Sequence, residues 1–194
     1  MKRWIYVLAM MSVLFFGSAV WADTFKVDPD HTTVGFKIRH LLGNVNGSFD
    51  EFEGTIDFDP ANLTLSKTSG TIQTASINTR VKERDKHLRS KDFFDAEKFP
   101  QIVFKSTKVL EATPAGGKLE GLLNIHGVEK PVILDVEIHG VANDPWGNTR
   151  AAFTATTKVN RQDFGLTWNQ AVEAGKFLVG DEVIITIEAE GIKQ

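Results

Sequence analysis

The residues best suited to chemistry lie in one charged segment, residues 84–90, which reads RDKHLRS. A guanidinium group matches the geometry of phosphate oxygens, and an imidazole can donate to or accept from a carbonyl oxygen. Arg84, His87 and Arg89 are therefore candidates to contact a phosphate or carbonyl oxygen of a ligand. The same segment has a structural explanation, in which Arg84 and Asp85 tie a helix to its neighbours through ion pairs. The structural explanation is favoured for Asp85, and both stay open for Arg89.

The spacing of the other reactive side chains does not indicate catalysis or a metal centre. The five histidines form no His-x-His or Glu-x-x-His pattern, and the acidic neighbours of His31 are more typical of a turn. The chain has no cysteine, no Gly-x-Ser-x-Gly and no phosphate-binding glycine loop. We therefore predict no catalytic residue, no metal and no cofactor. The alternative is an enzyme that acts on a bound molecule through His87 or His40 and a neighbouring carboxylate.

The elements that would position these side chains are β-strands. Apolar and polar residues alternate with period two through most of residues 23–194, which is typical of strands with one buried face. The pattern places these residues inward: Val34, Phe36 and Ile38 in 32–40; Leu119, Gly121, Leu123 and Ile125 in 117–127; Val132, Leu134, Val136 and Ile138 in 131–140; Ala151, Phe153, Ala155 and Val159 in 149–160; and Val183, Ile185, Ile187 and Ala189 in 182–191.

Two segments depart from this alternation. In residues 45–58 the inward parity changes at Asp50-Glu51, which predicts one long strand bent by a β-bulge, with two strands and a tight turn as the alternative. Residues 80–98 are charged and lack β-branched alternation. They predict a short helix over 81–90 and a further helical turn before Pro100.

About eight strands joined by short loops remain, and a single apolar face forces them to close into a barrel or to pair as two sheets. Gly47, Gly54, Gly121 and Ala151 occupy inward positions, where a solid core would use bulky branched residues. An eight-stranded barrel has room for one small ligand. No cysteine pair flanks a tryptophan, as it does in an immunoglobulin-type sandwich. We predict an all-β, eight-stranded antiparallel barrel with a lumen and a short helical insertion near residues 80–98.

Residues 1–22 have the layout of a secretory signal peptide. Lys2 and Arg3 precede an apolar stretch, and a tail of mostly small residues ends at Ala22. We expect cleavage after Ala22, export, and no stable membrane anchor afterwards, with residues 23–194 as one domain. An uncleaved membrane anchor is the alternative. Cleavage removes Lys2 and Arg3 and changes the net charge from −3 to −5, which gives nucleic acid little to bind.

A series of motifs resembles the YceI family of bacterial periplasmic proteins across essentially all of residues 23–194. The most specific part is residues 84–90 together with Asp92 and Phe93. The other motifs follow in the family's order: VD at 27–28, HTTVGF at 31–36, GSF at 47–49, FEG at 52–54, ASINT at 75–79, FPQIVF at 99–104, DPWG at 144–147 and NRQDFGL at 160–166.

This resemblance implies an elongated, lipocalin-like antiparallel barrel that the helical insertion closes on one side. It also implies a periplasmic protein that binds long amphiphiles, polyisoprenoids such as quinones or their precursors among them. We therefore expect a binding or carrier protein for a long-chain lipid. A scavenger of lipophilic toxins or of lipids released under stress is a further alternative, and a homodimer is compatible with the same sequence.

The expected ligand contacts follow from the inward positions. Burial of an apolar chain contributes about 4 kcal/mol for each five-carbon unit, against an association cost of about 4–15 kcal/mol. A neutral head-group hydrogen bond adds only about 1 kcal/mol, so chain length should dominate the affinity. The predicted lumen contacts are Phe36, Ile38, Phe49, Phe52, Ile56, Phe104, Leu123, Ile125 and Phe153. The predicted lid and mouth contacts are Arg84, His87, Leu88, Arg89, Phe93, Phe94, Phe164 and Trp168.

Overall fold

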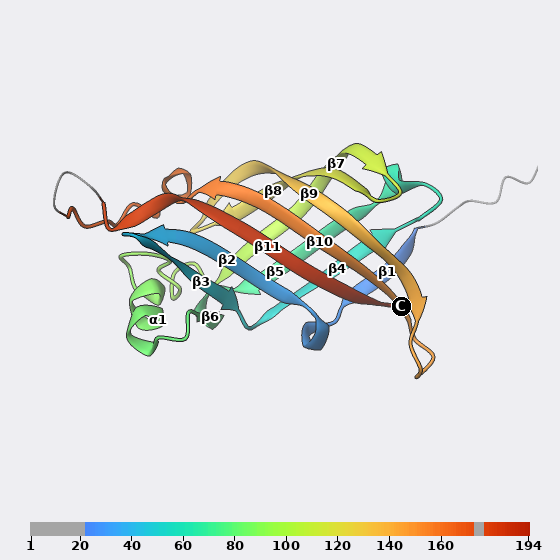
Figure 1. Cartoon of the computed structure of the whole chain (residues 1–194), viewed down its shortest axis with the longest axis horizontal. Helices are drawn as coiled ribbons and strands as arrows, with labels where there is room; N and C mark the ends of the chain where they lie inside the picture. Colours follow the sequence, from blue (N-terminus) through green and yellow to red (C-terminus); the bar gives the residue numbers. More distant parts are fainter. Residues whose placement is uncertain (1–21, 173–176) are drawn as a thin grey trace, which may run out of the picture.

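The computed structural model describes residues 22–172 and 177–194. The predicted signal peptide lies outside the described residues except for Ala22. None of the helices in the described ranges combines the length and the apolar character that a membrane crossing requires. Figure 1 shows an elongated β-structure that carries helix α1 at one end, opposite the end where β1 begins.

The described residues form strands connected mostly by short loops. The strands are β1 (Asp23–Val27), β2 (Thr33–His40), β3 (Gly43–Phe49), β4 (Phe52–Phe58), β5 (Lys67–Gln73), β6 (Ile77–Asn78), β7 (Gln101–Thr113), β8 (Gly116–Ile125), β9 (Val128–Asn143), β10 (Thr149–Asn160) and β11 (Val179–Lys193). The α-helix is α1 (Lys82–Arg89), and short 3-10 helices cover Pro29–His31, Leu63–Leu65, Thr74–Ser76 and Arg161–Phe164.

The sheet closes on itself, which confirms the predicted barrel. Strand β11 pairs with β2 through residues 179–188 and with β1 through residues 191–193, so β1 and β2 lie end to end in one barrel position. Strands β3 and β4 lie end to end in the next barrel position, where β3 pairs with β2 and β4 pairs with β1. The position after that holds β6, which pairs with β3, and β5, which pairs with β4. Strands β7 to β11 each fill one further position. Counted in this way, the barrel has eight antiparallel strands.

The change of parity at Asp50-Glu51 marks a bend within a barrel strand. On its two sides, β3 and β4 follow the same line along β2 and β1. Hydrogen bonds from Asp50 N to Ser76 O (3.2 Å) and from Gln73 N to Glu51 O (2.9 Å) hold the bend against the next strand. The extra residues therefore redirect the strand without opening the barrel, as the phase change predicts.

Buried apolar side chains form two clusters inside the barrel. The first packs against Leu88 and Phe94 below α1, and the second lies toward β1. The first consists of Val34, Phe49, Ile77, Ile102, Leu123, Ile125, Val159, Phe164 and Leu166. The second consists of Phe25, Phe58, Ala151 and Phe153. The two clusters hold the strands at different heights along the barrel axis.

The inward glycines do not create the lumen by leaving space empty, which corrects the argument made from the sequence. A Cβ atom at Gly47 would lie 2.4 Å from Phe36 Cζ, and one at Gly121 would lie 2.3 Å from Phe104 Cζ. Each of these glycines therefore accommodates an aromatic ring, and any side chain would displace that ring. These glycines leave room in the wall for the neighbouring aromatic rings.

Helix α1 is shorter than the charged segment of residues 80–98 that contains it. Helix α1 ends at Arg89, and residues 91–98 contain turns in place of the predicted further helical turn. Phe94 N donates to Leu88 O and Ala96 N donates to Arg89 O, both at 3.0 Å, so this stretch folds back onto the end of α1. The fold-back packs the Phe94 ring against the first buried cluster.

Candidate functional site

The barrel contains a cavity of about 470 Å³ beneath α1, which we call the first chamber. This volume falls within the range of about 300–1,000 Å³ that is typical of ligand sites. Aliphatic and aromatic side chains from most of the barrel strands and from α1 make up most of its wall. Six of the predicted lumen residues line it, namely Phe36, Ile38, Phe49, Phe104, Leu123 and Ile125.

A second chamber of about 190 Å³ lies further along the barrel. The remaining predicted lumen residues, Phe52, Ile56 and Phe153, line this one. Four side chains line both chambers and therefore form the boundary between them: Ile72, Phe104, Leu134 and Ile187. Phe104 carries the largest of the four side chains at this boundary.

Aromatic side chains gather where the first chamber meets α1. The His87 ring packs edge-on against Phe93 and Trp168, at centroid distances of 5.1 and 4.9 Å. His87 Nε2 also lies 2.9 Å from Asp92 Oδ2. These contacts fix the orientation of the imidazole beside the chamber. The predicted lid and mouth residues that line the chamber are Arg84, His87, Leu88, Phe93, Phe94, Phe164 and Trp168.

The charged residues of α1 divide between the chamber and the barrel wall. Asp85 is buried and accepts hydrogen bonds from Thr79 N (2.8 Å) and Thr79 Oγ1 (2.5 Å). Arg84 Nε donates to Thr79 Oγ1 at 2.7 Å, and Arg84 also lines the first chamber. Arg89, predicted at the mouth, instead donates to two backbone carbonyls within residues 75–77, at 2.6 and 2.8 Å, and lines neither chamber. Asp85 and Arg89 thus fasten α1 to the barrel.

Arg161 lines the first chamber and was missed by the sequence analysis. Its side chain is 3% exposed. The guanidinium donates to the backbone carbonyls of Leu166, Trp168 and Gly180, the last two at 2.9 Å, and to Asp181 Oδ1 at 3.1 Å. Burial lowers the pKa of Arg161, and the Asp181 carboxylate partly offsets this effect. Arg161 therefore holds the segment that places Trp168 beside His87.

An ionic cluster at the opposite end of the barrel is separate from both chambers. Asp28, His31 and Glu190 place their oxygen and nitrogen atoms within 4.8 Å of one another. Arg150 Nη1 lies 2.7 Å from Asp28 Oδ2 and 2.6 Å from Glu190 Oε1, so a guanidinium already occupies the place of a cation. The hydrogen bond from Arg150 lowers the pKa of Asp28 and that of Asp144. The cluster stabilises the turn before β2, the role expected of His31.

Comparison with known proteins identifies the family. Residues 25–191 match the model of the YceI-like domain. The chain belongs to the YceI family. The resemblance seen in the sequence motifs is thereby confirmed, and the two chambers are features of a YceI barrel.

Relatives of this YceI chain include curated proteins and solved structures. Protein YceI of Salmonella newport is 39% identical over an alignment of 200 residues that covers 100% of both chains. The crystal structure of a Campylobacter jejuni YceI protein is 38% identical, with a TM-score of 0.71 over 86% of this chain and 96% of that one. A polyisoprenoid binding domain from Saccharophagus degradans has a TM-score of 0.65 over 89% of this chain and 99% of that one. At 14% identity, this last likeness shows a shared fold.

Proposed function

We propose that this YceI protein holds a long-chain apolar amphiphile in its barrel and carries it through the periplasm. The observation that carries the proposal is the largely apolar first chamber of about 470 Å³, which meets a second chamber at Phe104. The polyisoprenoid binding domain from Saccharophagus degradans has the same fold, which supports polyisoprenoids as the ligand class. Quinones and their precursors belong to this class. Cleavage of the proposed signal peptide after Ala22 would release the barrel for this role.

The physical chemistry of the lumen favours selection by chain length. Each five-carbon unit that leaves water contributes about 4 kcal/mol before the cost of association is subtracted. The polar groups at the mouth, His87 and Arg84, add about 1 kcal/mol for a neutral hydrogen bond and about 1.5–3 kcal/mol for a charged one. The head group is therefore placed at the mouth and the chain in the chambers, with the chain as the larger contribution.

Titration with prenols of increasing length tests this proposal. We expect the affinity to rise at least about tenfold for each added five-carbon unit until the lumen is full, and then to level off. Exchange of the alcohol for a quinone or phosphate head group at constant chain length should change the affinity less than the addition of one five-carbon unit does. Calorimetry measures both series. Affinity that follows the head group and ignores the chain would contradict the proposal.

One contact favours a second candidate function, an enzyme that acts on the bound lipid. The pair His87–Asp92 beside the first chamber has the geometry of a general base oriented by a carboxylate. Analysis of the prenols recovered after the titration separates the two functions. Unchanged prenol supports binding alone. An altered product that disappears in His87→Gln and persists in His139→Gln, where the ring bonds to Thr154 on the outer face, would support the enzyme.

A further inference from the structure

The tip of the β2–β3 hairpin is apolar where a tight turn would favour polar residues. Leu41 and Leu42 form the two-residue turn, and their side chains are 47% and 87% exposed. Leu41 has a positive φ of 47°, a conformation that glycine and asparagine adopt more readily in such turns. Neither turn formation nor core packing explains two leucines here. We therefore infer that these side chains contact something outside the barrel.

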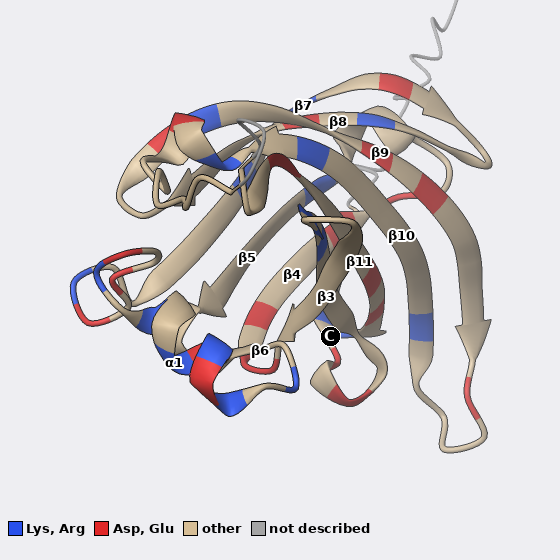
Figure 2. Ribbon diagram, turned by 60° about the vertical axis from the view of Figure 1, so that its left-hand side comes forward, with Lys and Arg blue, Asp and Glu red and all other residues tan. Residues whose placement is uncertain are grey.

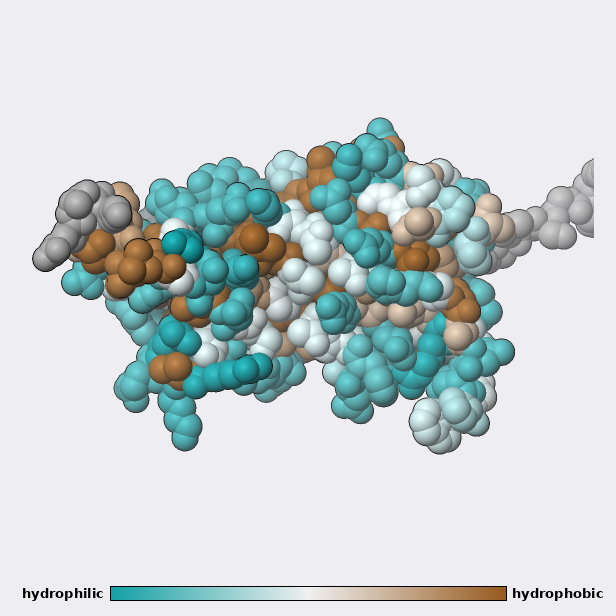
Figure 3. Space-filling view, viewed as in Figure 1, coloured by the Kyte–Doolittle hydropathy of each residue, from teal (hydrophilic) through white to brown (hydrophobic). Residues whose placement is uncertain are grey.

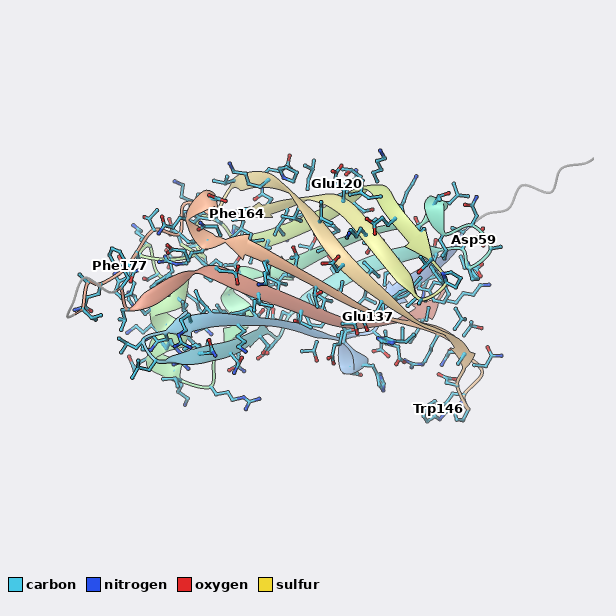
Figure 4. The ribbon with its side chains drawn as sticks, turned by 45° about the horizontal axis from the view of Figure 1, so that its top comes forward. Asp59, Glu120, Glu137, Trp146, Phe164 and Phe177 are labelled. Atoms are coloured by element: carbon cyan, nitrogen blue, oxygen red, sulfur yellow. The ribbon has the colours of Figure 1, made fainter. Side chains whose placement is uncertain are left out.

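A third exposed apolar side chain lies beside this hairpin. Phe177, just before β11, is 65% exposed, and Leu41 N donates to Leu178 O at 3.0 Å. We call Leu41, Leu42 and Phe177 the mouth tip. Figure 3 shows hydrophobic side chains at this end of the molecule, and Figure 4 places Phe177 at the extremity. The mouth tip adjoins the first chamber along the chain, because its sequence neighbours His40 and Leu178 line that chamber.

The segment around α1 adds positive charge at the same end of the barrel (Figure 1). Residues 80–92 contain six Lys or Arg and three Asp or Glu side chains, a net charge of +3 in a chain whose total is −3. Asp85 and Asp92 are engaged internally, and so are Arg84 and Arg89, which donate to residues 75–79. Lys82 and Lys86 are exposed. Figure 2 shows the basic positions of α1 at the end of the barrel.

The charges favour an anionic lipid surface over two other occupants. A second copy docked mouth to mouth would bring two segments of +3 together, which is repulsive. At the far end of the barrel Trp146 is 82% exposed, but Asp144, Asp28 and Glu190 gather there around the single guanidinium of Arg150. Anionic head groups would be repelled from that end. They complement the α1 end, where each lysine near such a surface strengthens binding about fivefold.

We propose that the mouth end docks reversibly on a bilayer that carries anionic head groups. The mouth tip enters the apolar boundary of the bilayer, and Lys82 and Lys86 lie over the lipid phosphates. This orientation turns the end of the barrel that holds the first chamber toward the lipid, so that an apolar ligand could pass between bilayer and barrel with little exposure to water. The docking surface goes beyond the proposed function, because it depends on outer residues and not on what the lumen holds.

Flotation with phosphatidylcholine vesicles, with and without phosphatidylglycerol, tests the docking surface. The protein comprising residues 23–194 should float with the vesicles that contain phosphatidylglycerol. It should lose this binding as the salt concentration is raised. Leu42→Ser should weaken the binding about tenfold, since a bulky apolar side chain no longer leaves water. Trp146→Ser, a change of an exposed apolar residue at the opposite end, is the matched control and should leave binding unchanged. Both positions are exposed, so folding should be retained.

A second variant separates charge from apolar contact. Lys82→Glu combined with Lys86→Glu should remove the preference for phosphatidylglycerol and weaken binding by about tenfold or more. Absence of flotation, equal binding to both vesicle types, or an equal loss in Trp146→Ser would each overturn the docking surface. Dissociation of a dimer by Leu42→Ser, seen by sedimentation, would assign the tip to a second copy instead. If lipid is still retained in the lumen while flotation fails, docking is refuted and the proposed function stands.

Discussion

Leu123→Trp should shorten the longest prenol that the barrel accepts and weaken the binding of longer prenols at least about a hundredfold. Leu123 is 6% exposed and projects from β8 into the wall of the first chamber. An indole at this position fills space that the chain would occupy, and each displaced five-carbon unit forfeits about 4 kcal/mol of burial. The affinity of the variant for prenols of each length measures the effect.

Leu122→Trp is the matched control for this substitution. Leu122 precedes Leu123 on β8, so its side chain points to the outer face, where it is 37% exposed. The control should bind the full range of prenols with unchanged affinity. Identical chain preferences in the two tryptophan variants would contradict the placement of the ligand in the first chamber.

Phe104→Ala should have the opposite effect and extend the range of chains toward longer ones. The Phe104 ring lies against Gly121 and borders both chambers, so its truncation should join them into one lumen. Phe104 is only partly buried, so the free energy of unfolding without ligand should fall by less than the loss of about 3–5 kcal/mol that is typical of a fully buried Phe→Ala change. Saturation with a long prenol should restore part of this loss, because the ligand binds only the folded barrel. Urea denaturation with and without prenol measures both values.

Phe153→Ala provides the comparison for Phe104→Ala. Phe153 is 8% exposed and lines the second chamber but not the first. Its ring packs against that of Phe58 at a centroid distance of 5.0 Å. Phe153 is buried more fully than Phe104, so its truncation should destabilise the barrel at least as much, without joining the chambers. If both variants shift the chain preference equally, the effect comes from added volume, and the boundary assigned to Phe104 is wrong.

The barrel and its lining could be predicted because period-two alternation is a local property of each strand. Phe36, Ile38, Leu123 and Ile125 follow directly from inward parity, and the structure places all four around the first chamber. The parity change at Asp50-Glu51 likewise predicts the bend in the strand. These features need no knowledge of which strands pair.

Other features depended on contacts between segments distant in the sequence. Arg161 occurs within a family motif, but its partners are mainly backbone carbonyls, which carry no signal in the side-chain pattern. Arg89 has the same residue type as Arg84 but follows Asp85 by four residues, so the helix places it on the Asp85 side of α1, where it bonds the carbonyls of residues 75–77. The division of the lumen depends on how the Phe104 ring lies over Gly121, and composition alone suggested an open lumen there.

Mass spectrometry of an organic extract tests most directly whether the barrel carries a lipid. Protein purified from a bacterial host without added ligand should yield an intact long-chain isoprenoid, in an amount comparable to that of the protein. The Leu123→Trp variant should yield shorter chains or less of the lipid, whereas Leu122→Trp should match the unmodified protein. A clean extract, together with no binding of long-chain prenols or quinones, would contradict the account.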